Sequence, residues 1–379
     1  MNNSIDEHPL SQPGFAPKVL VAPLDWGLGH ATRCVPVIYT LLAKGCTVII
    51  AASGPQETLL RSEFPQLNYL ELDGYAINYS KKRLMIRLAG QLFKIKNAIQ
   101  AEHRWLQQII TTHKIDWVIS DNRYGLWSQS IPCTLITHQL RVQMPTFFKW
   151  AENLIQAQLY DYIAHFNTCW VPDLPDEERG LSGLLGHPVK KPGIPTRYTG
   201  WLSRFNLQED QLNFTFKCLV VLSGPEPQRT LLENILLRQL VHSKEKIIMV
   251  RGLPNEKNLP AVAENITVFN HLPAPQMQRA FKECEYLVGR SGYSTLMDAF
   301  TLQKKCIFIP TPGQTEQEYL GKRLAEKKMA LLYKQDDFDL EKALSEAGNF
   351  DFHFPLNSMN NLLEMAVDNF IASNLKKLL

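Results

Sequence analysis

Short apolar runs alternate with amphipathic stretches along this chain, and the alternation starts twice. The first series opens with KVLVAPL (18–24) and CTVIIAAS (46–53), and the second with KCLVVLSG (217–224) and KIIMVRG (246–252). Strands that are apolar along their whole length are typical of parallel sheets covered by helices on both faces. The sequence therefore predicts an α/β protein that contains two doubly wound parallel sheets.

The bulk composition restricts the class of protein. The chain has 379 residues, enough for two domains with cores of their own, and its net charge of +3 gives no indication of nucleic-acid binding. Seven scattered Cys without a C-x-x-C pair predict reduced core thiols. Residues 1–17 are expected to be a loose polar tail without the apolar region of a signal peptide, and no run is long enough to cross a membrane. We therefore expect a cytoplasmic protein.

The segment 288–324 carries the clearest chemical signal. A strand, a turn and a helix are predicted there, and the unpaired N–H groups at a helix N-terminus attract phosphate. Asp298, further along the helix, could accept hydrogen bonds from sugar hydroxyls, and a polar loop follows the next strand. These features predict a nucleotide-sugar site, although SGYST could simply cap a helix. The turn and loop residues are Arg290, Ser291, Gly292, Gln314, Glu316, Gln317 and Glu318.

The same residues resemble the donor-binding half of GT-B glycosyltransferases, in particular the MurG-like group (glycosyltransferase family 28), which uses UDP-N-acetylglucosamine. The family pattern consists of an R-S-G turn, a Thr four residues after its Ser, a carboxylate on the helix and a Q-Q-Y loop, and this chain matches most of it. Two positions depart from the pattern, because Glu318 replaces the second amide and Asp298 replaces a Glu. The matching residues are Arg290, Ser291, Gly292, Thr295, Asp298, Gln317 and Tyr319.

The resemblance implies two Rossmann-like domains that face each other across a cleft. The first would bind an acceptor and the second a nucleotide sugar, and the last helix would return to the first domain. The predicted division is a tail at 1–17, an acceptor domain at 18–200, a donor domain at 201–356 and a returning helix at 357–379.

The turn after the first strand, PLDWGLGHATR (23–33), is similar to the glycine-rich loop of the family, which also ends in Gly-His. Gly27 and Gly29 would permit a tight turn close to bound groups. His30 is suited to act as a base on an acceptor hydroxyl, because its ordinary pKa lies near pH 7. Asp121 ends a neighbouring strand and could orient His30 or act as the base itself. The alternative is that both residues only cap helices.

Three further places are candidate contacts by the resemblance. His138 and Gln139 follow another strand and align loosely with an acceptor motif. Ser223 and Gly224 leave the first strand of the second series, where the family has a diphosphate-binding loop, and nearby Arg229 could add positive charge or be a solvated helix-start residue. Leu272, in FNHLP (269–273), is a candidate contact to the edge of the base.

The segment 79–99 is both basic and apolar. One stripe at helical spacing should face the core, and it consists of Leu84, Leu88, Leu92, Ile95 and Ile99. On another face basic residues flank apolar ones, which suits an anionic membrane surface and a lipid-linked acceptor, or equally a helix packed on two sides. That face comprises Arg83, Ile86, Arg87, Phe93 and Lys94.

The leading hypothesis is an inverting, metal-independent glycosyltransferase that moves a sugar, GlcNAc by the resemblance, from a UDP-sugar to an acceptor. No D-x-D motif follows a strand, so no metal and no cofactor are expected, and helix dipoles with Arg290 would neutralise the leaving diphosphate. The alternatives are a nucleotide-sugar epimerase on the same fold and a non-catalytic sugar-nucleotide-binding subunit. The GLGH turn and the basic segment favour the transferase.

Overall fold

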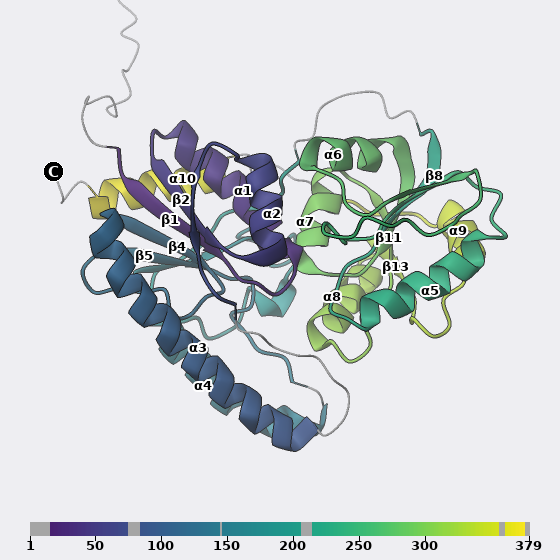
Figure 1. The fold of residues 1–379 in the computed structure, drawn as a ribbon. Coiled ribbons are helices and arrows are strands. Elements are labelled where there is room, and N and C mark those ends of the chain that lie inside the picture. Colours follow the sequence, from purple (N-terminus) through teal and green to yellow (C-terminus); the bar gives the residue numbers. More distant parts are fainter. Residues whose placement is uncertain (1–15, 75–83, 145, 206–213, 356–360, 376–379) are drawn as a thin grey trace, which may run out of the picture.

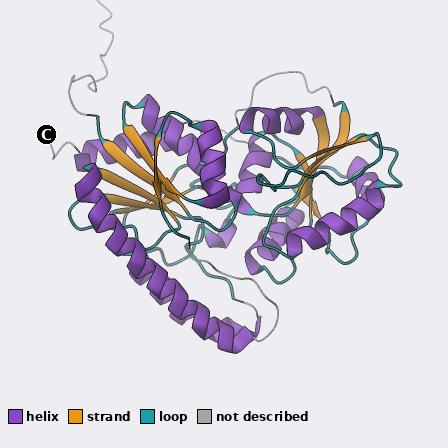
Figure 2. Cartoon of the chain, in the orientation of Figure 1, coloured by secondary structure: helices purple, strands orange, loops and turns teal. Residues whose placement is uncertain are grey.

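A computed structural model describes residues 16–74, 84–144, 146–205, 214–355 and 361–375, with the side chains of 84–93, 146–148 and 375 excluded. The protein forms two α/β domains side by side (Figure 1). Each has a parallel sheet between layers of helices (Figure 2).

The first domain is built on a seven-stranded sheet in the order β3-β2-β1-β4-β5-β6-β7, with every neighbouring pair parallel. The five inner strands of this sheet are almost entirely buried, as their unbroken apolar sequences require. They are β1 (Lys18–Pro23), β2 (Thr47–Ala52), β3 (Asn68–Glu71), β4 (Trp117–Asp121), β5 (Cys133–Ile136), β6 (Thr168–Val171) and β7 (Thr196–Tyr198).

The helices of the first domain include one from the end of the chain, α10, which packs against α1 and β7. Phe370 of α10 stacks on Trp117 of β4 with ring centroids 4.1 Å apart, and Lys44 pairs with Asp368 at 2.8 Å. The C-terminal segment thus lies on the first domain (Figure 1). The helices are α1 (Leu28–Ala43), α2 (Gly54–Glu63), α3 (Leu84–His113), η1 (Thr146–Ala151), α4 (Glu152–Ile163), η2 (Gly183–Leu185), α10 (Leu362–Phe370) and η3 (Ile371–Leu375).

The second domain has a six-stranded parallel sheet in the order β10-β9-β8-β11-β12-β13. Its strands are β8 (Phe216–Val221), β9 (Ile247–Val250), β10 (Ile266–Phe269), β11 (Cys284–Gly289), β12 (Lys305–Phe308) and β13 (Ala330–Leu332). Its helices are α5 (Gln228–Leu240), α6 (Ala274–Glu283), α7 (Tyr293–Thr301), α8 (Thr315–Glu326) and α9 (Leu340–Gly348).

Each sheet reverses its strand order once, between β1 and β4 in the first domain and between β8 and β11 in the second. Ligands of doubly wound sheets bind beyond the carboxyl ends of the strands at such a reversal. The turns that the sequence analysis singled out after β1, β4, β8 and β11 all lie there. The predicted α/β fold with two doubly wound parallel sheets is confirmed.

Other expectations have mixed outcomes. All seven Cys are buried and unpaired, as predicted. In the segment 79–99, residues 79–83 and the side chains of 84–93 lie outside the described part, but Ile99 is buried, Ile95 is partly buried beside it, and Lys94 is exposed. Within the described ranges, no helix combines the length and apolar character needed to span a bilayer.

Candidate active site

His30 and Asp121 meet at the carboxyl edge of the first sheet. Asp121 is the last residue of β4 and pairs in register with Pro23 of β1, and His30 lies in the first turn of α1 directly after β1. The Nδ1 atom of His30 is 2.9 Å from Oδ2 of Asp121. The two residues were expected on one rim of the sheet. They are in contact there, which is the arrangement of a base and the carboxylate that orients it.

Arg33, which was not among the predicted site residues, binds both members of this pair. Its Nε atom donates to Oδ1 of Asp121 at 2.8 Å, and its Nη2 atom also contacts that oxygen. Nη2 lies 2.8 Å from Nδ1 of His30, and Nη1 lies 3.2 Å from Nδ1 of His138. The side chain is fully buried. Residues three apart share a helix face, so the H-A-T-R spacing could have indicated Arg33 as a partner of His30.

The second domain adds a carboxylate to this cluster. Glu316, in the first turn of α8, accepts a hydrogen bond from Nε2 of His138 at 2.7 Å and another from the side chain of Gln139. The ring of His138 also stacks on Tyr293 of α7 with centroids 4.0 Å apart. The predicted acceptor residues His138 and Gln139 therefore contact the other domain in this structure.

The two domains touch at further points around this cluster. Ser294 donates to the carbonyl of Gly29 at 2.8 Å, and a Cβ atom on Gly29 would lie only 2.8 Å from that same hydroxyl. Gly29 was expected to make room for a bound group, but here it makes room for Ser294 of the second domain. Gly27 has a φ of +96°, which suits glycine at the start of α1. Lys327 reaches Glu178 across the same boundary at 2.8 Å.

Burial and charge set the protonation of these groups. Burial and the neighbouring Arg33 lower the pKa of His30, so its imidazole is neutral near pH 7. Burial opposes ionisation of Asp121, but Arg33 and His30 lower the pKa of that carboxyl below its usual value. Burial also opposes ionisation of Glu316, and His138 and Arg33 lower its pKa in the same way. The site therefore combines a neutral imidazole with two ionised carboxylates.

Four helix N-termini, three in the second domain and that of α1 in the first, could receive an anion. Among the described residues, no side chain caps the start of α1, α5, α7 or α8. Gly292 is the N-cap of α7, and Thr295 lies in its first turn, partly exposed. Uncapped first turns leave backbone N–H groups for a ligand such as a phosphate. The predicted turn thus precedes a helix as expected, with Ser291 buried beneath it and donating to the carbonyl of Gln317.

The loop between β12 and α8 lies next to the turn after β8. Gly224 has a φ of +101°, and a Cβ there would lie 3.5 Å from Oγ1 of Thr311. This Oγ1 atom and Oε1 of Gln314 are buried and make no protein hydrogen bond among the described residues. Gln317 and Glu318 instead fix this loop by accepting from the backbone N–H groups of Thr311 and Gly313, both at 2.8 Å. Ser223, before Gly224, is partly exposed at the carboxyl end of β8.

Arg290 corrects the sequence-based expectation. It was expected to neutralise a diphosphate, but it is fully buried, and its guanidinium donates to the carbonyls of Ile309, Pro310 and Gln228 and to the side chain of Gln335. Burial lowers its pKa to about 10. Arg290 thus fixes the loop after β12 from inside the protein. Its partners come from three segments that are distant in sequence, so sequence spacing does not reveal them.

Asp298 was expected to accept ribose hydroxyls, but it is buried and accepts from Ser203 at 2.8 Å. It also lies 3.4 Å from Arg204, so the link between the domains occupies its carboxylate. The side chain of Leu272 is buried in the core and cannot itself contact a base.

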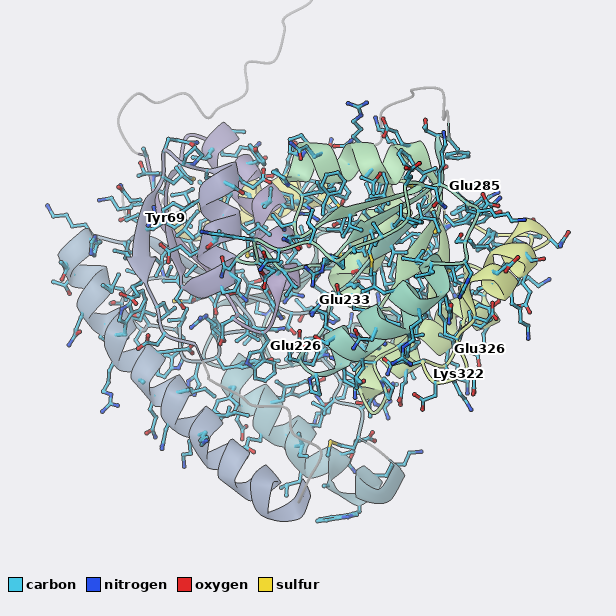
Figure 3. The ribbon with its side chains drawn as sticks, turned by 45° about the vertical axis from the view of Figure 1, so that its right-hand side comes forward. Tyr69, Glu226, Glu233, Glu285, Lys322 and Glu326 are labelled. Carbon is cyan, nitrogen blue, oxygen red and sulfur yellow. The ribbon has the colours of Figure 1, made fainter. Side chains whose placement is uncertain are left out.

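Arg229 was a candidate for extra charge beside the turn after β8. It is buried and pairs with Glu226 at 2.6 Å and with Glu233 at 2.9 Å. Figure 3 labels these two carboxylates, which lie just before and within the first turns of α5. Arg229 therefore fixes the start of α5, and its charge is already balanced.

No described residues form a group of three or more His, Cys, Asp or Glu side chains arranged to hold a metal ion.

Comparison with known proteins agrees with this arrangement. Residues 218–368 match the glycosyltransferase family 28 C-terminal domain. The second domain is thus similar to the C-terminal domain of glycosyltransferase family 28. The resemblance inferred from the sequence is thereby confirmed for this domain, which carries the turn after β11 and the loop before α8.

A relative and two solved structures extend the comparison. One relative is the UDP-N-acetylglucosamine--N-acetylmuramyl-(pentapeptide) pyrophosphoryl-undecaprenol N-acetylglucosamine transferase of Sulfurihydrogenibium sp. (strain YO3AOP1). The two sequences are 26% identical over 171 residues. This match covers 41% of this chain and about half (47%) of the relative. The glycosyltransferase SnogD from Streptomyces nogalater has a TM-score of 0.59 at 14% identity, covering 94% of this chain and all of its own. Acinetobacter baumannii MurG has a TM-score of 0.50 at 16% identity, covering 92% of each chain. The two domains together have the GT-B fold of these glycosyltransferases.

Proposed function

We propose that this protein is an inverting glycosyltransferase that moves a sugar, GlcNAc in the first instance, from a UDP-sugar to an acceptor hydroxyl. The contact between His30 and Asp121 at the strand-order reversal, opposite a family 28 donor domain, is the observation that carries the proposal. A neutral, buried imidazole oriented by a carboxylate is suited to take the proton of an attacking hydroxyl. Attack on the sugar carbon from the first domain, with the diphosphate held by the second, inverts that carbon.

The leaving diphosphate needs positive potential, and we propose that the protein supplies it without a metal. The first turn of α7 and the loop of Ser223 and Gly224 lie at the reversal of the second sheet. Thr311 places beside that loop a buried hydroxyl that has no hydrogen-bond partner among the residues described. Backbone N–H groups and helix dipoles stabilise developing negative charge when they are oriented in advance. Arg290 contributes indirectly, because it fixes the loop that carries Thr311.

We further propose a lipid-linked acceptor, with the protein bound peripherally at the cytoplasmic face of a membrane. Trp150 of η1 and Leu154 of α4 are 78% and 71% exposed. Tyr162 of α4 and Ile95 of α3 pack against the same cluster of Leu24 and Ile99, so α4 and the described part of α3, with its exposed Lys94, belong to one lobe. Exposed aromatic and aliphatic side chains near Lys and Arg are typical of contact with an anionic lipid surface.

The donor assignment is tested by thermal shift with UDP, GDP and TDP and their sugars. At a ligand concentration 100 times Kd, UDP or UDP-GlcNAc should stabilise the protein by about 2.7 kcal/mol. A response to another base with none to uridine nucleotides would contradict the donor. Acceptor-dependent release of UDP from UDP-GlcNAc then distinguishes transfer from epimerisation, which releases no UDP, and from binding alone.

A further inference from the structure

Five buried or half-buried polar groups form one connected network that crosses the domain boundary. It runs from His30 to Asp121, Arg33 and His138 in the first domain and ends at Glu316 in the second. A buried, charged network is unfavourable in free energy unless every member has a hydrogen-bond partner. Its connections specify where the protons lie.

The tautomer of His138 follows from its partners. Arginine only donates hydrogen bonds, so Nδ1 of His138 must accept from Nη1 of Arg33. The proton of the neutral ring is then on Nε2, which donates to the carboxylate of Glu316 at 2.7 Å. Glu316 therefore stabilises the one tautomer of His138 that can accept from Arg33.

The tautomer of His30 is not fixed in this way, because two groups compete for its Nδ1 atom. Asp121 can only accept from Nδ1, at 2.9 Å, and Arg33 can only donate to it, at 2.8 Å. If Nδ1–H donates to Asp121, Nε2 has a free lone pair and can act as a base. If Nδ1 accepts from Arg33, the proton moves to Nε2 and the base is lost.

We propose that Glu316 and Arg33 are positioning residues that make His30 a base when the domains close. This inference rests on the proposed function. Glu316 reaches His138 only when the domains are in contact, and the acceptor that it creates on His138 holds one arm of the Arg33 guanidinium. Without that acceptor an N–H group of His138 would face Nη1 and disfavour the present position of the guanidinium, and Nη2, which already lies 2.8 Å from Nδ1 of His30, would become the donor to that atom. Closure therefore favours the form of His30 in which Nδ1–H donates to Asp121 and Nε2 is free, with Arg33 held between Asp121 and His138.

The direct test is a nitrogen-15 NMR measurement of the histidine tautomers in the full chain labelled at histidine. Spectra of His30→Gln and His138→Gln assign the two rings among the 10 His residues. The wild type should show His30 as the Nδ1–H form and His138 as the Nε2–H form. In Glu316→Gln, whose amide can donate as well as accept, the Nε2–H form of His30 should increase severalfold.

Two further variants separate the network from general effects. Arg33→Lys keeps the charge but cannot bridge Asp121 and His138 at once, so it should change the His30 tautomer in the same direction. Lys327→Gln removes the contact to Glu178 at the same domain boundary and should leave the His30 spectrum unchanged. Glu316 is partly exposed, so its variant remains informative if the Arg33 variant fails to fold.

A pH titration of His30 gives a second readout. Burial is the largest cause of the lowered pKa of His30, and the positive charge of Arg33 is the second. Arg33→Met removes this charge, so the midpoint of the His30 titration should rise. In Arg33→Lys the charge stays, so the midpoint should move less while the tautomer still changes. Several charged or titratable groups face the pair of His30 and Asp121. They are Arg33 and Cys34 from α1, His138 from the segment after β5 and Glu316 from α8.

Turnover completes the test. Glu316→Gln should reduce UDP release from UDP-GlcNAc about tenfold or more, with the Kd for UDP within twofold of the wild type. Identical His30 tautomers in the wild type, Glu316→Gln and Arg33→Lys would overturn the proposal. The spectra require no donor or acceptor, so failure to bind UDP would contradict the proposed function and leave this test intact.

Discussion

Replacing Asp121 with Asn should destabilise the first domain strongly. Asp121 is fully buried and accepts hydrogen bonds from Arg33 and His30, so its loss leaves a buried guanidinium without its carboxylate. Removing one partner of a buried ion pair typically costs about 3–5 kcal/mol. For a domain of this size each kcal/mol lowers Tm by roughly 2–4 °C, so Asp121→Asn should lower the Tm of the first domain by roughly 6–20 °C.

The matched control is Glu57→Gln, which breaks the pair of Glu57 with Arg61 on α2. Arg61 is 52% exposed, and exposed pairs at this spacing are worth about 0.3–0.5 kcal/mol. The double variant Asp121→Asn with Arg33→Met removes both charges and should unfold at a higher temperature than Asp121→Asn alone. Thermal unfolding followed by circular dichroism, with and without UDP, measures all four proteins.

The pH dependence has a defined sign. The folded-state pKa of Asp121 lies below its unfolded value, so the pair stabilises the protein fully above about pH 4 and the contribution is lost as pH falls through the folded pKa. The difference in stability between wild type and Asp121→Asn should therefore shrink in acid. If Asp121→Asn unfolds within 2 °C of the wild type at pH 7, the carboxylate does not balance Arg33 and the description of this site is wrong.

Three other predictions follow from the site. His30→Ala should lower acceptor-dependent UDP release by about 10²–10⁴-fold with little change in UDP affinity, and a near-normal rate would place the base elsewhere. Asp298→Asn should change the Kd for UDP less than twofold, because the carboxylate binds Ser203 and Arg204 in the segment that links the domains. If calorimetry shows that the affinity for UDP falls tenfold or more, Asp298 contacts the ribose after all. Changing Trp150 and Leu154 together to Ser should reduce co-sedimentation with anionic vesicles, and unchanged binding would remove this surface from the membrane proposal.

The sequence predicted the positions of elements better than the roles of side chains. Apolar runs identify buried strands because burial on both faces leaves little choice of residue, and the strand ends then identify the reversal where His30, Asp121 and Gly292 lie. The direction of a side chain at a strand end depends on neighbours that are distant in sequence. Arg290 illustrates this, since the carbonyl of Gln228 and the side chain of Gln335 share its guanidinium.

The role of Glu316 could not be predicted from the sequence either. It was grouped with Gln314, Gln317 and Glu318 as part of the donor site, because one polar loop holds all four. The structure divides them, since Gln317 and Glu318 bind their own loop and Glu316 reaches His138. Only the approach of the two domains decides this, and no local pattern encodes it.

The charges of the network explain why such an approach suits general-base catalysis. When His30 is neutral and His138 accepts from Arg33, the single positive charge of Arg33 faces the two carboxylates of Asp121 and Glu316, so the buried cluster carries one net negative charge. A proton taken up by His30 from an acceptor hydroxyl brings the cluster to neutrality at the moment when the hydroxyl becomes a nucleophile. Because interactions between charges are stronger away from water, this uptake is favoured most when Glu316 is in place. An open protein, without Glu316 beside His138, lacks that second negative charge, and its base should therefore stay weak until the domains have closed.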